Sequence, residues 1–210
     1  MSTDIELRHA ICDWGRSIFE RGLTSGSSGN ISVRTGTGYI ITPTNSCLGR
    51  LDPMRLSTLD ATGRYAGGDK PSKEVPLHLA FYEARAEAMA VVHLHSTYAT
   101  ALSCRSDIDA ENCLPALTPY VLMRAGKVPL LPYTDPGTVD STLDILRLAP
   151  KHSSILLANH GPVVSGTSLD GAVYAAEELE EAAKVAFVLE GRPVRHLDAD
   201  TIERLTTRYR

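Results

Sequence analysis

The stretch that decides the fold is Val91-Val92-His93-Leu94-His95-Ser96, which follows an alanine- and glutamate-rich segment. Residues 90–94 are almost all apolar, a pattern typical of a buried strand. Residues two apart on a strand point to the same face, so His93 and His95 are expected side by side, with Leu94 pointing the other way. Two imidazoles at that spacing can share one metal ion. Taken alone, such a pair is more often two hydrogen-bonded histidines near a strand end, so the rest of the chain must decide.

Length and composition describe an ordinary globular chain. Its 210 residues, 43% hydrophobic and 22% charged, predict one domain spanning residues 1–210. A formal net charge of -4 gives no reason to expect a nucleic-acid partner, and no apolar run is long enough for a membrane span. Four cysteines without C-x-x-C spacing, and early charged residues where a secretory signal would be apolar, predict a reduced, cytoplasmic protein.

Periodicity and turn residues predict one α/β domain of alternating helices and strands. Helices are expected at 5–21, from Ser72 as N-cap to about 88, and at 96–102, 140–149, 168–190 and 200–210. Strands are expected at 31–34, 39–42, 90–95, 128–133, 154–158 and 163–166, with a short helix and an edge hairpin within 51–69. Gly22 is expected at the C-cap of the first helix.

Two further residues could complete a metal site with the histidine pair. His160 follows the apolar strand at 154–158, and Glu74 stands near the start of the helix that precedes His93. Three imidazoles and one carboxylate form an ordinary zinc shell. Glu74 could instead simply stabilise the helix N-terminus. Because the chain has seven histidines, this set alone is weak evidence.

The loop at residues 23–30 is rich in serine and glycine. By composition it is a flexible connector, and the alternative is a nest of backbone N–H groups that binds an anion such as phosphate. It matches neither of the glycine patterns that bind nucleotides, so a nucleotide ligand is not indicated.

The flanking residues resemble those of the class II aldolase/adducin family over nearly the whole chain. Five segments in the family's order carry this resemblance: Gly29-Asn30-Ile31-Ser32-Val33-Arg34, Ile41-Thr42-Pro43-Thr44, Lys70-Pro71-Ser72-Lys73-Glu74, Val91-Val92-His93-Leu94-His95 and Asn159-His160-Gly161. Five ordered motifs are far more specific than one H-x-H pair. A looser match, Leu114 to Tyr120, resembles the segment that holds the family's proton-donating tyrosine.

The resemblance implies a three-layer α/β/α fold with a central, mostly antiparallel sheet, assembled as a homotetramer with sites near subunit interfaces. It implies one Zn²⁺ or other divalent ion per subunit, held by His93, His95 and His160. Glu74 would be the acid–base residue, ligating the metal before substrate binds, and Tyr120 would act in its own or a neighbouring subunit's site. The residues implied to bind substrate phosphate are Gly29, Asn30, Thr44, Asn45, Ser72 and Lys73.

Two positions depart from the sugar-phosphate aldolases of the family. Lys73 stands where those enzymes have a second serine, and Asn45 where they often have glycine. A cation beside the site suits a substrate with an added carboxylate, although Lys73 could also be a solvent-exposed lysine. The motif set most resembles the branch that decarboxylates 3-oxo-tetronate 4-phosphates, which implies release of CO2 and dihydroxyacetone phosphate through a metal-stabilised enediolate.

Other functions share the same metal shell. The alternatives are an aldolase or epimerase acting on fuculose or ribulose phosphates, and a methylthioribulose-phosphate dehydratase. A non-catalytic interaction module like the adducin head has no need of all three histidines, which are present here. A zinc protease is disfavoured because the chain has no H-E-x-x-H.

Overall fold

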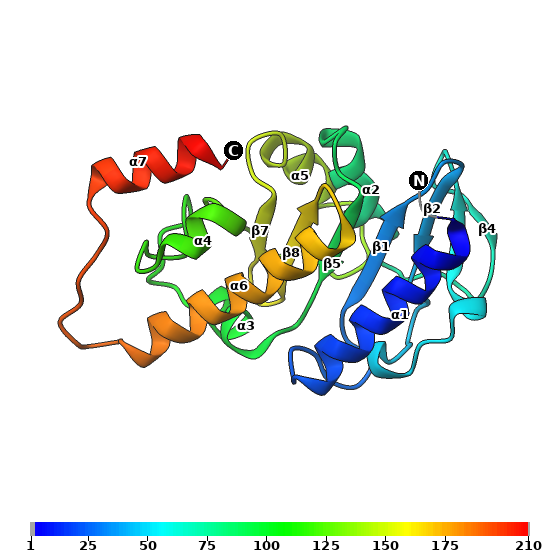
Figure 1. Cartoon of the computed structure of the whole chain (residues 1–210), viewed down its shortest axis with the longest axis horizontal. Coiled ribbons are helices and arrows are strands. Elements are labelled where there is room, and N and C mark those ends of the chain that lie inside the picture. The colour runs from blue at the N-terminus through cyan, green and yellow to red at the C-terminus, as the bar shows by residue number, and fades with distance from the viewer. Residues whose placement is uncertain (1–2, 210) are drawn as a thin grey trace.

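Strand β5 (Ala90–His93) lies in the middle of an eight-stranded sheet with the order β4-β3-β2-β1-β5-β8-β7-β6 (Figure 1). The computed structural model describes residues 3–209. All neighbouring strands are antiparallel except β6 and β7, which confirms the predicted sheet. The other strands are β1 (Asn30–Arg34), β2 (Gly38–Ile41), β3 (Ser57–Asp60), β4 (Tyr65–Gly67), β6 (Leu130–Leu131), β7 (Ser154–Leu157) and β8 (Gly161–Gly166).

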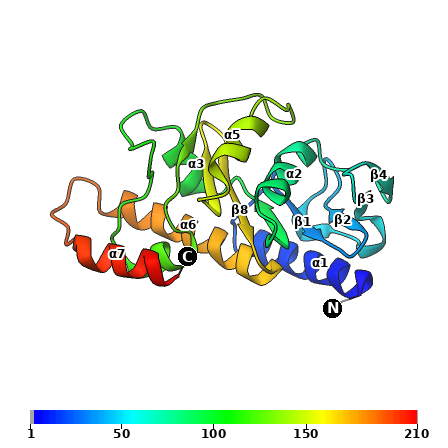
Figure 2. The same ribbon diagram turned by 90° about the horizontal axis from the view of Figure 1, so that it is seen from above.

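Alternate side chains of the central strands enter two separate cores. Val92 and Leu94 belong to the core beneath α1 (Asp4–Glu20) and α6 (Leu169–Val188), whereas Val91 belongs to the core beneath α2 (Val75–Ala84) and α5 (Thr142–Leu148). Figure 2 shows these two helix pairs on opposite sides of the sheet. Helices α3 (Thr97–Ser103), α4 (Pro119–Arg124) and α7 (Ala199–Arg208) contribute to the first core. The three-layer α/β/α prediction is therefore confirmed, with His93 on the α2 side.

The first helix forms where its apolar stripe predicts. Ile11 and Ile18 are fully buried, and Gly22 follows the helix with a φ of 74°. At its start, the Thr3 hydroxyl accepts from the Glu6 N–H and the Glu6 carboxylate accepts from the Thr3 N–H, which forms a capping box. The short 3-10 helices η1 (Leu48–Arg50) and η2 (Pro53–Arg55) follow later in this half of the chain.

Several predicted elements differ in extent. Helix α2 runs from Val75 to Ala84 with Glu74 as its N-cap, because the Ser72 hydroxyl accepts the Glu74 N–H in a turn that precedes the helix. The strand predicted at 128–133 shrinks to Leu130–Leu131, because the flanking Pro129 and Pro132 lack the N–H that a ladder needs. The last helix ends at Arg208, and residue 210 of the predicted range lies outside the described residues.

None of the helices within residues 3–209 combines the length and the apolar character that a membrane crossing requires.

Candidate active site

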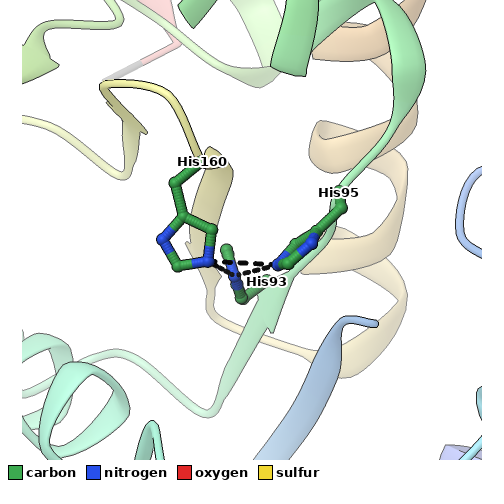
Figure 3. Close-up of side chains that lie close together, drawn as sticks. All are labelled: His93, His95 and His160. Atoms are coloured by element: carbon green, nitrogen blue, oxygen red, sulfur yellow. Dashed lines mark hydrogen bonds between the residues drawn. The ribbon is translucent and has the colours of Figure 1, made fainter. Parts of the chain in front are cut away.

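Three histidine side chains converge at the end of β5. His93 is the last residue of the strand, His95 follows two residues later, and His160 lies in the turn between β7 and β8. The His93 Nε2 atom lies 3.1 Å from that of His95 and 3.2 Å from that of His160, and the last two Nε2 atoms are 3.1 Å apart (Figure 3). Strand β5 ends at His93, two residues before the predicted end, so His95 lies in the segment that follows the strand, and its ring still meets that of His93 as predicted.

The turn at residues 159–161 carries His160 over the end of β5. Asn159 has a φ of 55° and Gly161 a φ of 153°, in a region that favours glycine. A Cβ at Gly161 would lie 2.4 Å from the Leu94 carbonyl oxygen, so only glycine permits this close approach. The antiparallel register of β5 and β8 pairs His93 with Val163, and this register fixes where the turn lies relative to His93.

Glu74 completes the cluster from the start of α2. Its carboxylate oxygens lie 3.6 Å from Nε2 of His93 and 3.4 Å from Nε2 of His160, and the residue is buried. The side-chain amide of Asn30, on the adjacent strand β1, donates a hydrogen bond of 2.6 Å to the same carboxylate. The structure therefore brings together all four predicted metal ligands.

Burial and neighbouring charges set the protonation of these groups. Burial lowers the pKa of His93 and His95, and it lowers the pKa of His160 to about 4, with the positive charge of His93 acting in the same direction. Burial alone would raise the pKa of Glu74, but the charge of His93 and the Asn30 hydrogen bond bring it below its ordinary value. At neutral pH the cluster is three neutral imidazoles facing a carboxylate.

This donor set fits a divalent metal ion. The Nδ1–H of His93 donates to the Pro162 carbonyl oxygen at 2.9 Å, which leaves the Nε2 lone pair pointing at the other two rings. Tetrahedral zinc–nitrogen bonds of about 2.05 Å place ligand nitrogens roughly 3.3 Å apart, close to the separations seen here. Neutral imidazoles with converging lone pairs repel one another unless a cation lies between them.

A cavity of about 270 Å³ opens over this cluster. Of the metal ligands, Glu74, His95 and His160 line it, while His93 is fully buried beneath them. All six predicted phosphate-binding residues also line it: Gly29, Asn30, Thr44, Asn45, Ser72 and Lys73. Gly29 has a φ of 80°, and a Cβ there would lie 3.0 Å from the His93 carbonyl oxygen, so the serine- and glycine-rich loop packs directly on the metal-site strand.

Lys73 contributes a positive charge to this cavity, whereas the Asn30 side chain is hydrogen-bonded to other residues. Lys73 is exposed, and its charge adds a small contribution to the lowered pKa of His95 and His160, after burial and the neighbouring histidines. The Asn30 amide is engaged with Glu74 and His78, which leaves one amide N–H of its side chain available to a ligand.

Tyr120 lies away from the histidines of its own chain. It is 59% exposed, at the second residue of α4, and lines a separate, open hollow of about 680 Å³ together with Tyr98, Arg124 and Tyr174. This hollow is larger than the cavity over the histidines, but it contains no comparable group of metal ligands. Within one chain, the structure does not bring Tyr120 to the proposed site.

Five residues around the site were not among the predicted site residues. Ser27, Ser28, Pro43 and Pro136 line the cavity, and His78 contacts Asn30 behind it. The two serines belong to the loop already identified as a possible anion nest, so the sequence held a signal for them. Pro136 comes from a loop between β6 and α5 that has no distinguishing motif.

The chain belongs to the class II aldolase and adducin family. The family model described as class II aldolase and adducin N-terminal domain matches residues 9–187. The solved structure of YgbL from Escherichia coli superposes with a TM-score of 0.95 at 48% identity, covering 98% of this chain and 100% of its own. The resemblance seen in the five motifs is thereby confirmed.

Curated relatives carry more than one activity. A 3-oxo-tetronate 4-phosphate decarboxylase from Pectobacterium atrosepticum is 47% identical over 207 residues, covering 98% of this chain and 95% of that protein. An L-fuculose phosphate aldolase from Escherichia coli K12 is 31% identical over 182 residues, covering 86% of this chain and 82% of that protein.

Proposed function

We propose that this protein is a carbon–carbon lyase that decarboxylates a 3-oxo-tetronate 4-phosphate to dihydroxyacetone phosphate and CO2. The observation that carries the proposal is the single cavity in which the three-histidine cluster, the serine- and glycine-rich loop and Lys73 meet. The 47% sequence identity to a 3-oxo-tetronate 4-phosphate decarboxylase supports the same substrate.

The cavity residues divide the work of binding and proton transfer. When bound, a divalent ion supplies Lewis-acid stabilisation of negative charge on adjacent substrate oxygens. Backbone N–H groups at Gly29 and hydroxyl groups at Thr44 and Ser72 bind the phosphate, and Lys73 binds the carboxylate. Loss of CO2 breaks a carbon–carbon bond and leaves its electron pair on the substrate carbon, which then takes a proton from a tyrosine, or from Glu74 after that carboxylate has itself taken a proton from solvent.

We infer that this tyrosine is Tyr120 of a neighbouring subunit in a homotetramer. Its exposure on α4 and its position outside the cavity of its own chain support this arrangement. A hybrid experiment tests it. Tyr120→Phe and His95→Ala chains should each be nearly inactive alone and regain activity when mixed. The double variant mixed with wild type controls for subunit exchange, and no recovery despite proven exchange would refute the inference.

The assay for the main proposal is release of CO2 by purified, zinc-loaded protein. Both stereochemical series of 3-oxo-tetronate 4-phosphate should be offered, because the cavity lining does not select one. Release of CO2 with formation of dihydroxyacetone phosphate is the expected result. Turnover of L-fuculose or L-ribulose phosphate without CO2 release would instead assign the chain to the aldolases and epimerases of the family, and elimination of water from methylthioribulose phosphate to the dehydratases.

We propose Zn²⁺ as the native ion, because three imidazoles and one carboxylate form a tetrahedral zinc shell. Metal analysis should find one ion per chain, and His93→Ala should lose it while His196→Ala, at an exposed histidine, retains it. A native protein with no metal would favour an adducin-like interaction module over an enzyme.

We also propose a cytoplasmic location. All four cysteines are free thiols, and two of them, Cys12 and Cys113, are buried packing residues. Such usage is typical of a reducing compartment, where a small phosphorylated sugar acid would also be retained. Fractionation of the native host would test this.

A further inference from the structure

A ladder of buried polar side chains runs behind Glu74, between α2 and β1. On α2, Glu74, His78 and Tyr82 are spaced four residues apart, which is about 6 Å of helix rise per step. On β1, Asn30 and Ser32 are two residues apart and point to one face, about 6.8 Å per step. Because the two spacings nearly match, each strand side chain lies between two helix side chains.

Hydrogen bonds connect all five members of this ladder. The Asn30 amide nitrogen lies 2.6 Å from the Glu74 carboxylate, and the Asn30 oxygen contacts Nε2 of His78. The Ser32 hydroxyl oxygen lies 2.7 Å from Nδ1 of His78 and 2.8 Å from the Tyr82 hydroxyl oxygen. All five residues are at most 6% exposed, so water does not compete for these bonds.

The chemistry of the groups fixes the direction of each bond. An ionised carboxylate only accepts, so the Asn30 amide turns its nitrogen toward Glu74 and its oxygen toward His78. That oxygen only accepts, so Nε2 of His78 carries the ring hydrogen. The Nδ1 atom then accepts from the Ser32 hydroxyl, which in turn accepts from the Tyr82 hydroxyl. Each of these four bonds then has one donor and one acceptor, and no other direction satisfies all four.

We propose that His78, Ser32 and Tyr82 are positioning residues that lock the Asn30 amide with its N–H toward Glu74. If the amide rotated by half a turn, its oxygen would face the carboxylate and repel it. The locked amide therefore holds one carboxylate oxygen in place beside the histidine cluster. This role rests on the proposed function of Glu74 as the acid–base residue.

The ladder orients Glu74 and does not conduct protons to solvent. Its far end is Tyr82, which is 3% exposed and stacks against Tyr39 with ring centroids 4.7 Å apart. The guanidinium group of Arg34 donates to the Tyr82 carbonyl oxygen at 2.7 Å and lies over the Tyr82 ring, which closes that end. A closed chain without a solvent outlet suits a fixed orientation.

Nitrogen-15 NMR of the histidine rings tests the ladder without any substrate. In zinc-loaded protein labelled at histidine nitrogens, the His78 ring should show the tautomer with hydrogen on Nε2 and a bare Nδ1. The His78→Gln spectrum assigns the signal by its loss. A His78 ring with hydrogen on Nδ1, or one exchanging between both forms, would overturn the proposal. This result is independent of which reaction the protein catalyses.

Two matched variants test the consequence for turnover. Glutamine places an amide nitrogen near the position of Nε2, whereas asparagine reaches only the position of Nδ1. With whichever substrate the protein turns over, His78→Asn should reduce kcat by about 10- to 100-fold with KM changed less than threefold, and His78→Gln should recover much of the loss. Equal losses in both variants would overturn the proposal.

Folding is checked by thermal unfolding of each variant. If neither His78 variant folds, Ser32→Ala and Ser32→Thr replace them, because threonine keeps the hydroxyl that donates to Nδ1. Ser32→Thr should then exceed Ser32→Ala in kcat at similar KM, and equal kcat values would count against the ladder. A protein with the expected tautomer and no lyase activity would retain the ladder and refute the proposed function alone.

Discussion

At the scale of single residues, Lys73 is the side chain that most directly distinguishes this cavity from that of a sugar-phosphate aldolase. It lines the cavity beside Ser72 and Glu74. Lys73→Ser should raise KM for the 3-oxo acid by about 10- to 100-fold, because one charge-assisted hydrogen bond worth about 1.5–3 kcal/mol is lost. Steady-state kinetics measure this. Lys70→Ser, outside this cavity, is the control, and an equal effect there would contradict a specific role.

Gly161 is the residue whose backbone carries His160 into place. Gly161→Ala should destabilise the protein by at least about 2 kcal/mol, because a Cβ would lie 2.4 Å from the Leu94 carbonyl oxygen in a strained conformation. Urea unfolding of the metal-free protein measures the change. Gly36→Ala is the matched control, since a Cβ there meets no atom within 4 Å. Similar stabilities for the two variants would contradict this account.

Much of the metal site is predictable from individual residues, and its supporting contacts are not. The spacing of His93 and His95 predicts a shared face from strand geometry alone, and the motif resemblance adds His160 and Glu74. The bond from Asn30 to Glu74 depends on how α2 crosses β1, which no local pattern encodes. The role of Asn30 in phosphate binding stays a prediction, because the residue lines the cavity while its side-chain amide contacts Glu74 and His78.

At the scale of elements, α3 depends on a carboxylate from α6. Both oxygens of the buried Glu180 accept from backbone N–H groups at the start of α3, at 2.9 Å from Tyr98 and 2.8 Å from Ala99. Because α3 begins two residues after His95, this contact fixes the segment that holds the second histidine. A helix start satisfied by a distant acid is stabilised by both hydrogen bonding and the helix dipole.

Removing that carboxylate should weaken the fold. Glu180→Ala is expected to cost about 2 kcal/mol, since two first-turn N–H groups lose a charged partner in a buried setting. Chemical denaturation provides the measurement. The neighbouring Glu181, whose side chain is 62% exposed, gives the control variant Glu181→Ala, which should change stability by less than about 0.5 kcal/mol. A loss no larger than the control's would show that α3 does not need this cap.

The exact ends of helices and strands depend on prolines and turn hydrogen bonds, which the spacing of apolar residues does not reveal. The apolar stripes of α1 and α6 predicted both helices to within about two residues, because each buries one face against the sheet. Prolines on both sides limit β6 to two residues, because neither Pro129 nor Pro132 can donate a backbone N–H to the ladder. Helix α2 begins later than predicted because the Ser72 hydroxyl accepts the Glu74 N–H in a turn that precedes the helix.

At the scale of the whole molecule, buried neutral histidines link stability to pH. Burial lowers the pKa of His78 to about 3 and that of His160 to about 4, whereas both titrate near 6.5 when unfolded. Between these values the unfolded chain binds more protons, so stability is fully present above about pH 6.5 and is lost as pH falls toward 4. Each such histidine contributes up to about 1.4 kcal/mol per pH unit.

Metal-free protein should therefore unfold at progressively lower urea concentration as pH falls from 7.5 to 5. His160→Asn removes one of the responsible groups and should give a shallower dependence over the same range. Stability that stayed constant between pH 7 and 5 would contradict the burial of neutral imidazoles. The metal-free protein is used because protons compete with a bound ion for the histidine nitrogens, and this competition would add a second pH dependence.

His93 is completely buried beneath His95, His160 and Glu74, so an ion held by these residues would exchange through the cavities that border them, chiefly the cavity of about 270 Å³ above. A ligand bound in the cavity above the histidines would therefore slow exchange of the metal ion. Inorganic phosphate at saturating concentration should slow the stripping of zinc by a chelator, as followed by a coloured zinc indicator. A divalent ion held by these residues would therefore be retained for as long as the cavity is occupied.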